Sequence, residues 1–247
     1  LKNIRERFDR FWESMRIILD FMLERGRTEL DSDEANEIRE RDRSQRGLPR
    51  GEERLHFSPL EVACISGVMQ KGAGEEDSGY RMLHQRLTEQ LFYERLKEKD
   101  PRLRPESIQE WLSLPLTEEL VGAMAQLGED LWNSDRAGEL AVFLDKPVGV
   151  RALERMLAGR LELRETVETF KKRLKALLDA CGDSSASSLA KLLLFGVPDR
   201  VEGLPVTDHL RAMWEVTAQW IEYRHRSDLA RELSVSYSRL GDVYVSL

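Results

Sequence analysis

The 247-residue chain contains few of the residues with which proteins build disulfides, metal sites and membrane spans. It has 2 cysteines and 4 histidines, and no stretch approaches the ~18 consecutive apolar residues of a membrane helix. Cys64 and Cys181 lie far apart, each in or beside an apolar helical segment. We expect two reduced, buried thiols that act as small hydrophobic residues; a redox pair or a nucleophile is the alternative.

The histidines show no metal-binding pattern. None of them has a second histidine or cysteine three or four residues away, which is the spacing of a helical metal site. We expect His56 in a loop and His84, His209 and His225 on separate helices, each facing solvent or a helix interface. A pocket-facing His84 is the alternative. The sequence therefore predicts no metal and no cofactor.

Positive charge is in deficit. Lys and Arg number 38 against 45 Asp and Glu, which gives a net charge of −7 and argues against a general nucleic-acid binder. Arginines gather between residues 39 and 54, but acidic residues such as Glu40, Asp42, Glu52 and Glu53 are interleaved with them. We expect a solvated helix over 32–46 that leads into a mobile loop at 47–57. Nucleic-acid sensing through residues 39–54 is the weaker alternative.

Only 8 prolines and 16 glycines interrupt the chain, and β-branched residues rarely occur in runs. Apolar residues instead recur at steps of three and four, most clearly from Ile4 to Leu23, where Gly26 is placed to end the helix. The sequence predicts an all-α fold of about ten helices in an irregular solenoid-like or bundled array. Further helices are expected at 58–69, 78–99, around 108–112, and at 117–132, 135–145, 148–158, 161–181, 184–195, from 207 and from 227.

Residues 58–74 carry two local signals. Ser58, Pro59 and Glu61 form the pattern of a capping box with proline at the first helical position. The following Lys71-Gly-Ala-Gly74 invites comparison with a phosphate-binding loop. That type of loop needs a strand before it and Gly-Lys-Ser/Thr after it. We expect a helix before it, and Glu75, Glu76 and Asp77 follow, so we reject a phosphate site.

Catalytic patterns are equally scarce. The acidic pairs Glu75/Glu76 and Glu118/Glu119 are adjacent, so on a helix their side chains point about 100° apart and cannot flank a bond. The serine-rich stretch 184–188 has no Gly-x-Ser-x-Gly context. We therefore expect no enzyme active site within this chain.

The last eleven residues contain the most specific pattern in the sequence. Tyr237, Leu240, Gly241 and Tyr244 stand at i, i+3, i+4 and i+7, so they share one face of a helix. Glycine within that face indicates the close approach of another helix. The segment 228–247 resembles the first helix of a tetratricopeptide repeat (TPR), Trp-x-x-Leu-Gly-x-x-Tyr, with tyrosine in the tryptophan position. The resemblance implies that these four residues pack between helices and bind no ligand.

The polar stretch 26–57 and the loop 196–206 are the candidate boundaries within the chain, and the resemblance implies a function. We expect three parts: residues 1–46 as N-terminal helices, 58–196 as a helical core, and 207–247 as a helical pair that leads into a truncated repeat. The function expected is a non-catalytic, cytoplasmic scaffold for protein–protein interaction, a fragment of a larger bacterial protein that precedes a TPR array. The alternative is a regulatory helical region of a multidomain signalling or defence protein, a peptidase or nucleotide hydrolase whose catalytic domain lies outside this chain.

Overall fold

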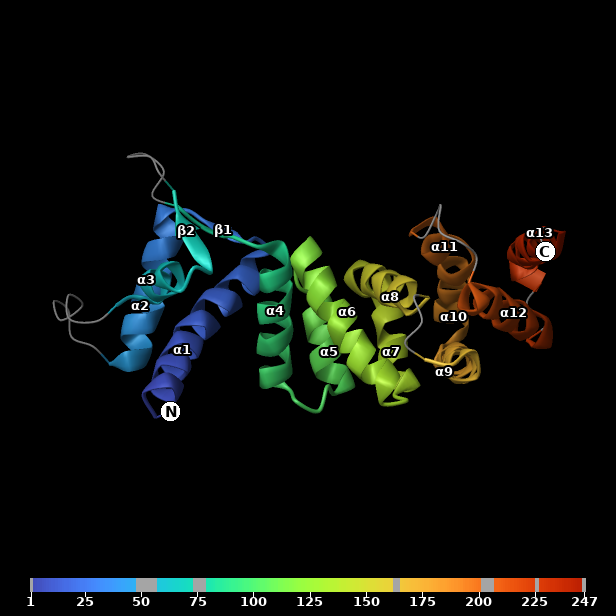
Figure 1. Ribbon diagram of the computed structural model, residues 1–247, viewed down its shortest axis with the longest axis horizontal. Coiled ribbons are helices and arrows are strands. Elements are labelled where there is room, and N and C mark those ends of the chain that lie inside the picture. The colour runs from blue at the N-terminus through green and yellow to red at the C-terminus, as the bar shows by residue number, and fades with distance from the viewer. Residues whose placement is uncertain are drawn as a thin grey trace. The chain divides into compact units, whose positions relative to one another are not determined.

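The computed structural model of the protein describes residues 2–47, 57–72, 79–161, 165–200, 207–224 and 227–245. These residues are nearly all helical, so the predicted all-α class is confirmed (Figure 1). The chain divides into two compact units. Residues 1–101 and 114–123 form the first unit, and residues 102–113 and 124–247 form the second. The boundaries expected at 26–57 and 196–206 remain predictions.

The first unit surrounds its longest helix. Its elements are α1 (Lys2–Arg25), β1 (Glu29–Leu30), α2 (Ser32–Arg46), α3 (Pro59–Ile65), β2 (Met69–Lys71), β3 (Tyr80–Met82), α4 (Gln85–Lys99) and the start of α6 (Glu118–Asn133). Helix α1 contacts α2, α3 and α4 and buries Met15, Ile18 and Met22 completely. Gly26 ends α1 in the left-handed region at φ +67°, as predicted, and a Cβ there would lie 2.2 Å from the Cβ of Pro115.

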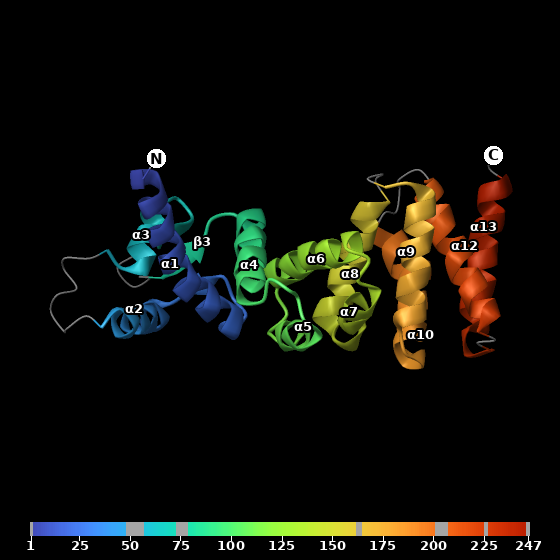
Figure 2. The ribbon, with the colours of Figure 1, turned by 90° about the horizontal axis from the view of Figure 1, so that it is seen from below.

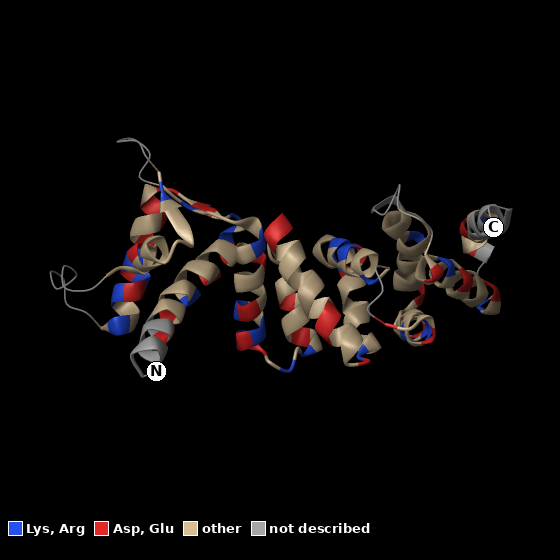
Figure 3. Ribbon diagram, in the orientation of Figure 1, with Lys and Arg blue, Asp and Glu red and all other residues tan. Residues whose placement is uncertain are grey.

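The polar segment 32–46 forms α2, as predicted, but the helix is not solvated on all sides. Ile38 is fully buried on its inner face. Asp31 and Glu34 form a capping box at its start, and Gly47 ends it in the left-handed region. Acidic and basic residues alternate along the helix (Figure 3). Residues 48–56, where a mobile loop was expected, lie outside the described residues.

A small antiparallel sheet was not predicted. Its strand order is β1-β3-β2, with Leu30 opposite Tyr80 and Met69 opposite Met82. The helix expected over 58–69 ends at Ile65, because Gly67 takes a left-handed conformation at φ +73°. The helix expected over 78–99 begins only at Gln85. Pairing of the two strands buries Met69 and Tyr80, and this burial outweighs the local preference for helix.

Strand β2 also bears on the comparison of residues 71–74 with a phosphate-binding loop. Strand β2 ends at Lys71, directly before Gly72, where we expected a helix. The acidic residues that follow in the sequence, and the absence of Gly-Lys-Ser/Thr, still argue against a phosphate loop. Residues 73–78 themselves lie outside the described residues.

The second unit contains helices only, among its described residues. They are α5 (Pro105–Leu112), the rest of α6, α7 (Ala137–Ala141), η2 (Val142–Asp145), α8 (Pro147–Arg160), α9 (Val167–Ala180), α10 (Asp183–Lys191), η3 (Leu192–Gly196), α11 (Val197–Arg200), α12 (Asp208–Tyr223), η4 (Ser227–Leu229) and α13 (Ala230–Val245). Helix α12 is central: it contacts α9, η3 and α13 (Figure 2). Trp214, Thr217 and Ile221 are among its many buried residues.

Two helix ends in this unit differ from the prediction. Helix α9 begins at Val167 rather than near 161, because Thr166 accepts a hydrogen bond from the Thr169 amide and caps it. The helix expected to end at Gly196 continues through the π-helical turn η3 into α11. Pro198 has no amide hydrogen and cannot make an α-helical hydrogen bond. In the residue before it, the Val197 amide bonds to the Leu192 carbonyl, five residues earlier. This wider π-helical turn accommodates the proline within the helix.

Candidate functional site

The candidate site is a groove in the second unit between α9 and α12. Three interactions join these helices: His209 Nε2 to the Glu165 carbonyl (2.9 Å), Lys171 to Glu215 (3.0 Å) and Arg224 to Asp179 (3.4 Å). Each joins residues 44 or 45 positions apart, and both residue numbers rise together. The two helices therefore run parallel and side by side, and the groove is lined by residues of both.

Threonine caps determine where both helices begin. Thr166 and Thr207 each accept a hydrogen bond from a backbone amide three residues later, which satisfies one of the free amides at the helix start. Helix α9 turns Phe170, Leu174 and Leu178 inward, where they are fully buried. Its opposite face is therefore left to line the groove.

A hydrogen-bonded cluster holds the start of α9. The Glu165 carboxylate, whose side chain is only 8% exposed, accepts hydrogen bonds from Trp132 Nε1 and Arg173, both at 2.8 Å. Arg173 also donates to Asp135 at 2.8 Å, and this hydrogen bond lowers the pKa of Asp135 below its usual value. Asp135 lies in the left-handed region, at φ +55°, where α6 ends. Arg173 also donates to the Asn133 carbonyl at 3.2 Å, so three partners fix its position and that of the helix that carries it.

The end of α6 explains that left-handed residue. The amide of Asp135 bonds to the Trp132 carbonyl, and the amide of Arg136 bonds to the Leu131 carbonyl. This pair of bonds is a Schellman motif, which requires a left-handed residue at the position of Asp135. Arg136 then bonds to the carbonyls of Arg102 and Leu103, which ties the start of α7 to the segment before α5.

The groove has a volume of about 640 Å³. Its α9 wall carries five charged side chains: Glu168, Lys171, Lys172, Lys175 and Asp179. Its α12 wall is formed by Val216, Gln219, Trp220 and Tyr223. Val216 and Trp220 are buried and form the floor, whereas the Tyr223 side chain is 80% exposed at one end. The groove thus combines an apolar aromatic wall with a charged wall.

The charges on the α9 wall are not all neutralised by neighbours. Lys171 pairs with Glu215, and Asp179 pairs with Arg224. Lys172 and Lys175 are exposed and make no hydrogen bond or ion pair with the described residues. This arrangement offers two ammonium groups beside an aromatic surface.

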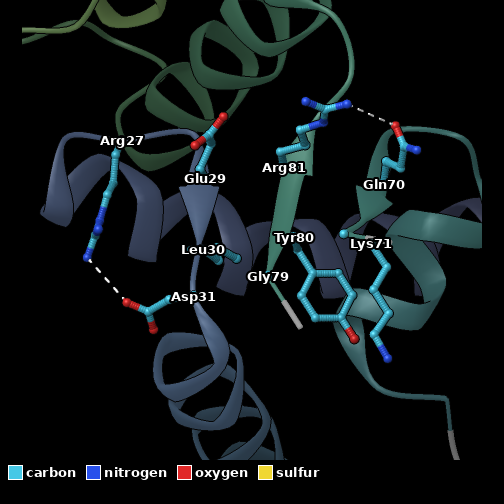
Figure 4. A pocket seen from close by; sticks show the side chains of 10 residues that line it. Arg27, Glu29, Leu30, Asp31, Gln70, Lys71, Gly79, Tyr80 and Arg81 are labelled. Atoms are coloured by element: carbon cyan, nitrogen blue, oxygen red, sulfur yellow. Dashed lines mark hydrogen bonds and ion pairs between the residues drawn. The ribbon is translucent and has the colours of Figure 1, made fainter. Parts of the chain in front are cut away.

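A second hollow, of about 450 Å³, lies on the sheet of the first unit (Figure 4). Arg27 there forms ion pairs with Asp31 (4.0 Å) and Glu34, and Arg81 points to Gln70, to which it donates at 3.5 Å. The hollow carries charges of both signs, and Gly72 and Gly79 in its lining flank residues 73–78, which are not described. It therefore indicates no class of ligand.

The predicted repeat residues lie on α13, which packs against α12. The Tyr237 hydroxyl donates a hydrogen bond to Glu222 of α12, which raises the pKa of Tyr237, and the side chain is 48% exposed. Leu240, Gly241 and Tyr244 have helical backbone, but their packing lies outside what the structure describes. Their packing role stays a prediction.

The residues considered for chemistry are not brought together. His84 precedes α4 in an extended conformation rather than on a helix, His209 is buried at the α9–α12 interface, and His56 and His225 lie outside the described residues. In the described ranges no cluster of three potential metal ligands is found. Both cysteines are free and half-buried, and burial raises the pKa of each, that of Cys181 to about 12.

Sequence reasoning did not identify the groove. The lysines of α9 and the aromatic residues of α12 were visible, but nothing in the sequence pairs two helices that lie over 40 residues apart.

Across the described part of the chain, no helix has the length and apolarity needed to cross a bilayer. No family model matches the chain, and no curated protein or solved structure is detectably similar to it.

Proposed function

We propose that this chain is a non-catalytic helical scaffold that binds a partner protein in the groove between α9 and α12. The observation that carries the proposal is the exposed Tyr223 beside the apolar floor of Val216 and Trp220. Exposed aromatic residues next to a well-packed apolar surface are typical of the energetic centre of protein interfaces. The TPR resemblance of the final helix supports the same class of function.

The rigid construction of the groove also supports binding. Ion pairs join α9 to α12 at Lys171–Glu215 and again at Asp179–Arg224, and His209 joins them at the opposite end. A groove whose walls are already fixed loses little conformational entropy when a partner enters. The partner therefore meets a preformed surface.

The proposal is tested by selecting peptides of about 16 residues, which as a helix are roughly 24 Å long and so can span the groove, from a random library displayed on phage. The full chain is the target, and an unrelated helical protein is the control target. Affinities of enriched peptides are then measured by fluorescence anisotropy against the wild type and two variants. Tyr223→Ala removes the exposed aromatic of the groove, and Phe57→Ala removes an aromatic of the first unit that is 66% exposed.

We expect peptides specific for this chain, with binding weakened about ten-fold or more by Tyr223→Ala and unchanged by Phe57→Ala. Far-UV circular dichroism of both variants checks that the fold is intact. Two results would overturn the proposal: a selection that enriches nothing beyond the control target, or binding that Tyr223→Ala leaves unchanged.

A further inference from the structure

We infer that the partner segment bound in the α9–α12 groove is an acidic amphipathic helix. This inference rests on the proposed function, because it specifies the chemistry of the partner for that same groove. It is carried by the unequal charge of the two walls and by the helical lining and length of the groove.

The charge of the groove favours carboxylates near the middle of α9. Lys172 and Lys175 stand one turn apart, both exposed and without an ion pair among the described residues. The neighbouring carboxylate of Asp135 is already bound by Arg173. Asp or Glu side chains of a partner can therefore approach both ammonium groups without displacing an existing ion pair.

The two ends of the α9 wall offer no unpaired positive charge to a carboxylate. Glu168, in the first turn of α9, is exposed and has no ion-pair partner within the described ranges. Towards the C-terminal end of α9, Asp179 is already paired with Arg224. The acidic positions of the partner are therefore expected opposite Lys172 and Lys175, away from Glu168. The net charge of −7 does not favour an acidic partner at long range, so the attraction is local to Lys172 and Lys175.

The shape of the groove favours a helix over an extended strand. All described neighbours of the groove are helical, so it offers no free strand edge for a peptide backbone. From Glu168 to Asp179 it extends over three helical turns, roughly 16 Å. A helical partner of that length can place large apolar side chains on the floor of Val216 and Trp220 at i and i+3 or i+4. Its acidic residues then face the α9 wall.

The test uses the library described above, with the full chain and a Lys172→Glu/Lys175→Glu double variant as separate targets. Peptides enriched on the wild type are expected to carry an excess of Asp and Glu beside an apolar stripe of helical spacing. Their affinity should fall about ten-fold or more for the double variant, and the variant should enrich basic peptides instead. Lys146→Glu is the control for charge, because Lys146 is an exposed lysine of the same unit outside the groove.

Helical binding is tested on the strongest peptide. Proline at a central, solvent-facing position is compared with alanine at that position, and we expect proline to weaken binding about ten-fold or more. The inference is overturned by enriched peptides that are neutral or basic, by unchanged affinity for the double variant, or by tolerance of proline. If such peptides still depend on Tyr223, the proposed function stands and only the inference fails. If they do not depend on Tyr223, the proposed function fails as well.

Discussion

Replacing Gly149 with alanine tests how closely α8 approaches η2 in the second unit. A Cβ at position 149 would lie 2.1 Å from the carbonyl oxygen of Phe143 and 2.7 Å from the carbonyl carbon. These are backbone atoms, so no rotamer change relieves the contact and the two segments must separate. Overpacking of this kind costs typically about 1–3 kcal/mol, and alanine regains only about 0.5–1 kcal/mol through its helix propensity. We expect the Gly149→Ala variant to be less stable than the wild type by about 1–2 kcal/mol.

The matched control lies on the same helix. Gly159 is exposed and has no atom within 4 Å of the position of its Cβ, so Gly159→Ala should stabilise the protein by about 0.5–1 kcal/mol. Urea unfolding of the full chain, followed by circular dichroism, gives both values. If the Gly149→Ala variant proves as stable as the Gly159→Ala variant, the close packing of α8 on η2 is wrong.

Three further substitutions probe other contacts, each by unfolding of the full chain. Glu165→Gln weakens the acceptor shared by Trp132 and Arg173 and should cost about 1–3 kcal/mol; no loss would show that this cluster does not hold α9. Burial alone would raise the pKa of Asp20, but hydrogen bonds from Arg95 and Lys99 lower it overall. Its stabilising contribution is therefore present above the ordinary carboxyl pKa and lost as the pH falls below it, so Asp20→Asn should destabilise the chain at about pH 7 and make little difference near about pH 2. An equal loss at both pH values contradicts this. Ile38→Ala should cost about 2–4 kcal/mol, because the side chain is fully buried; a loss below about 0.5 kcal/mol, the range of surface positions, would show that α2 is solvated on all sides.

Local signals in the sequence were sufficient for most of the helices. The capping box at Ser58 is present, with Glu61 bonded back to the Ser58 amide at 2.7 Å. Gly26 ends α1 in the left-handed region. Both features depend on residues within three or four positions of each other, so a single sequence contains the information needed to predict them.

The sheet could not be predicted in the same way. Its strands are two or three residues long, and Met69 pairs with Met82 through contacts that no local pattern encodes. Gly67 is a local signal for the end of α3. The sequence-based prediction extended the helix past it because apolar residues continue to Met69. Helical periodicity was assigned to these segments because their apolar residues also suit one face of a helix.

The groove shows the same limit for function. The apolar faces of α9 and α12 were predicted, but the sequence does not reveal that Lys171 and Glu215 meet across them. The exposure of Tyr223 depends equally on that pairing, which no local pattern in the sequence contains. The helical periodicity led to the correct class of fold but not to this surface.

Hydrogen exchange measured by mass spectrometry tests the central claim most directly. The full chain is compared with and without a saturating amount of the strongest selected peptide. Binding in the groove predicts slower exchange in α9 and α12, at residues 167–180 and 208–223, and no change in α4 of the first unit. Protection confined to the sheet or to the helices of the first unit, with α9 and α12 unchanged, would contradict the account.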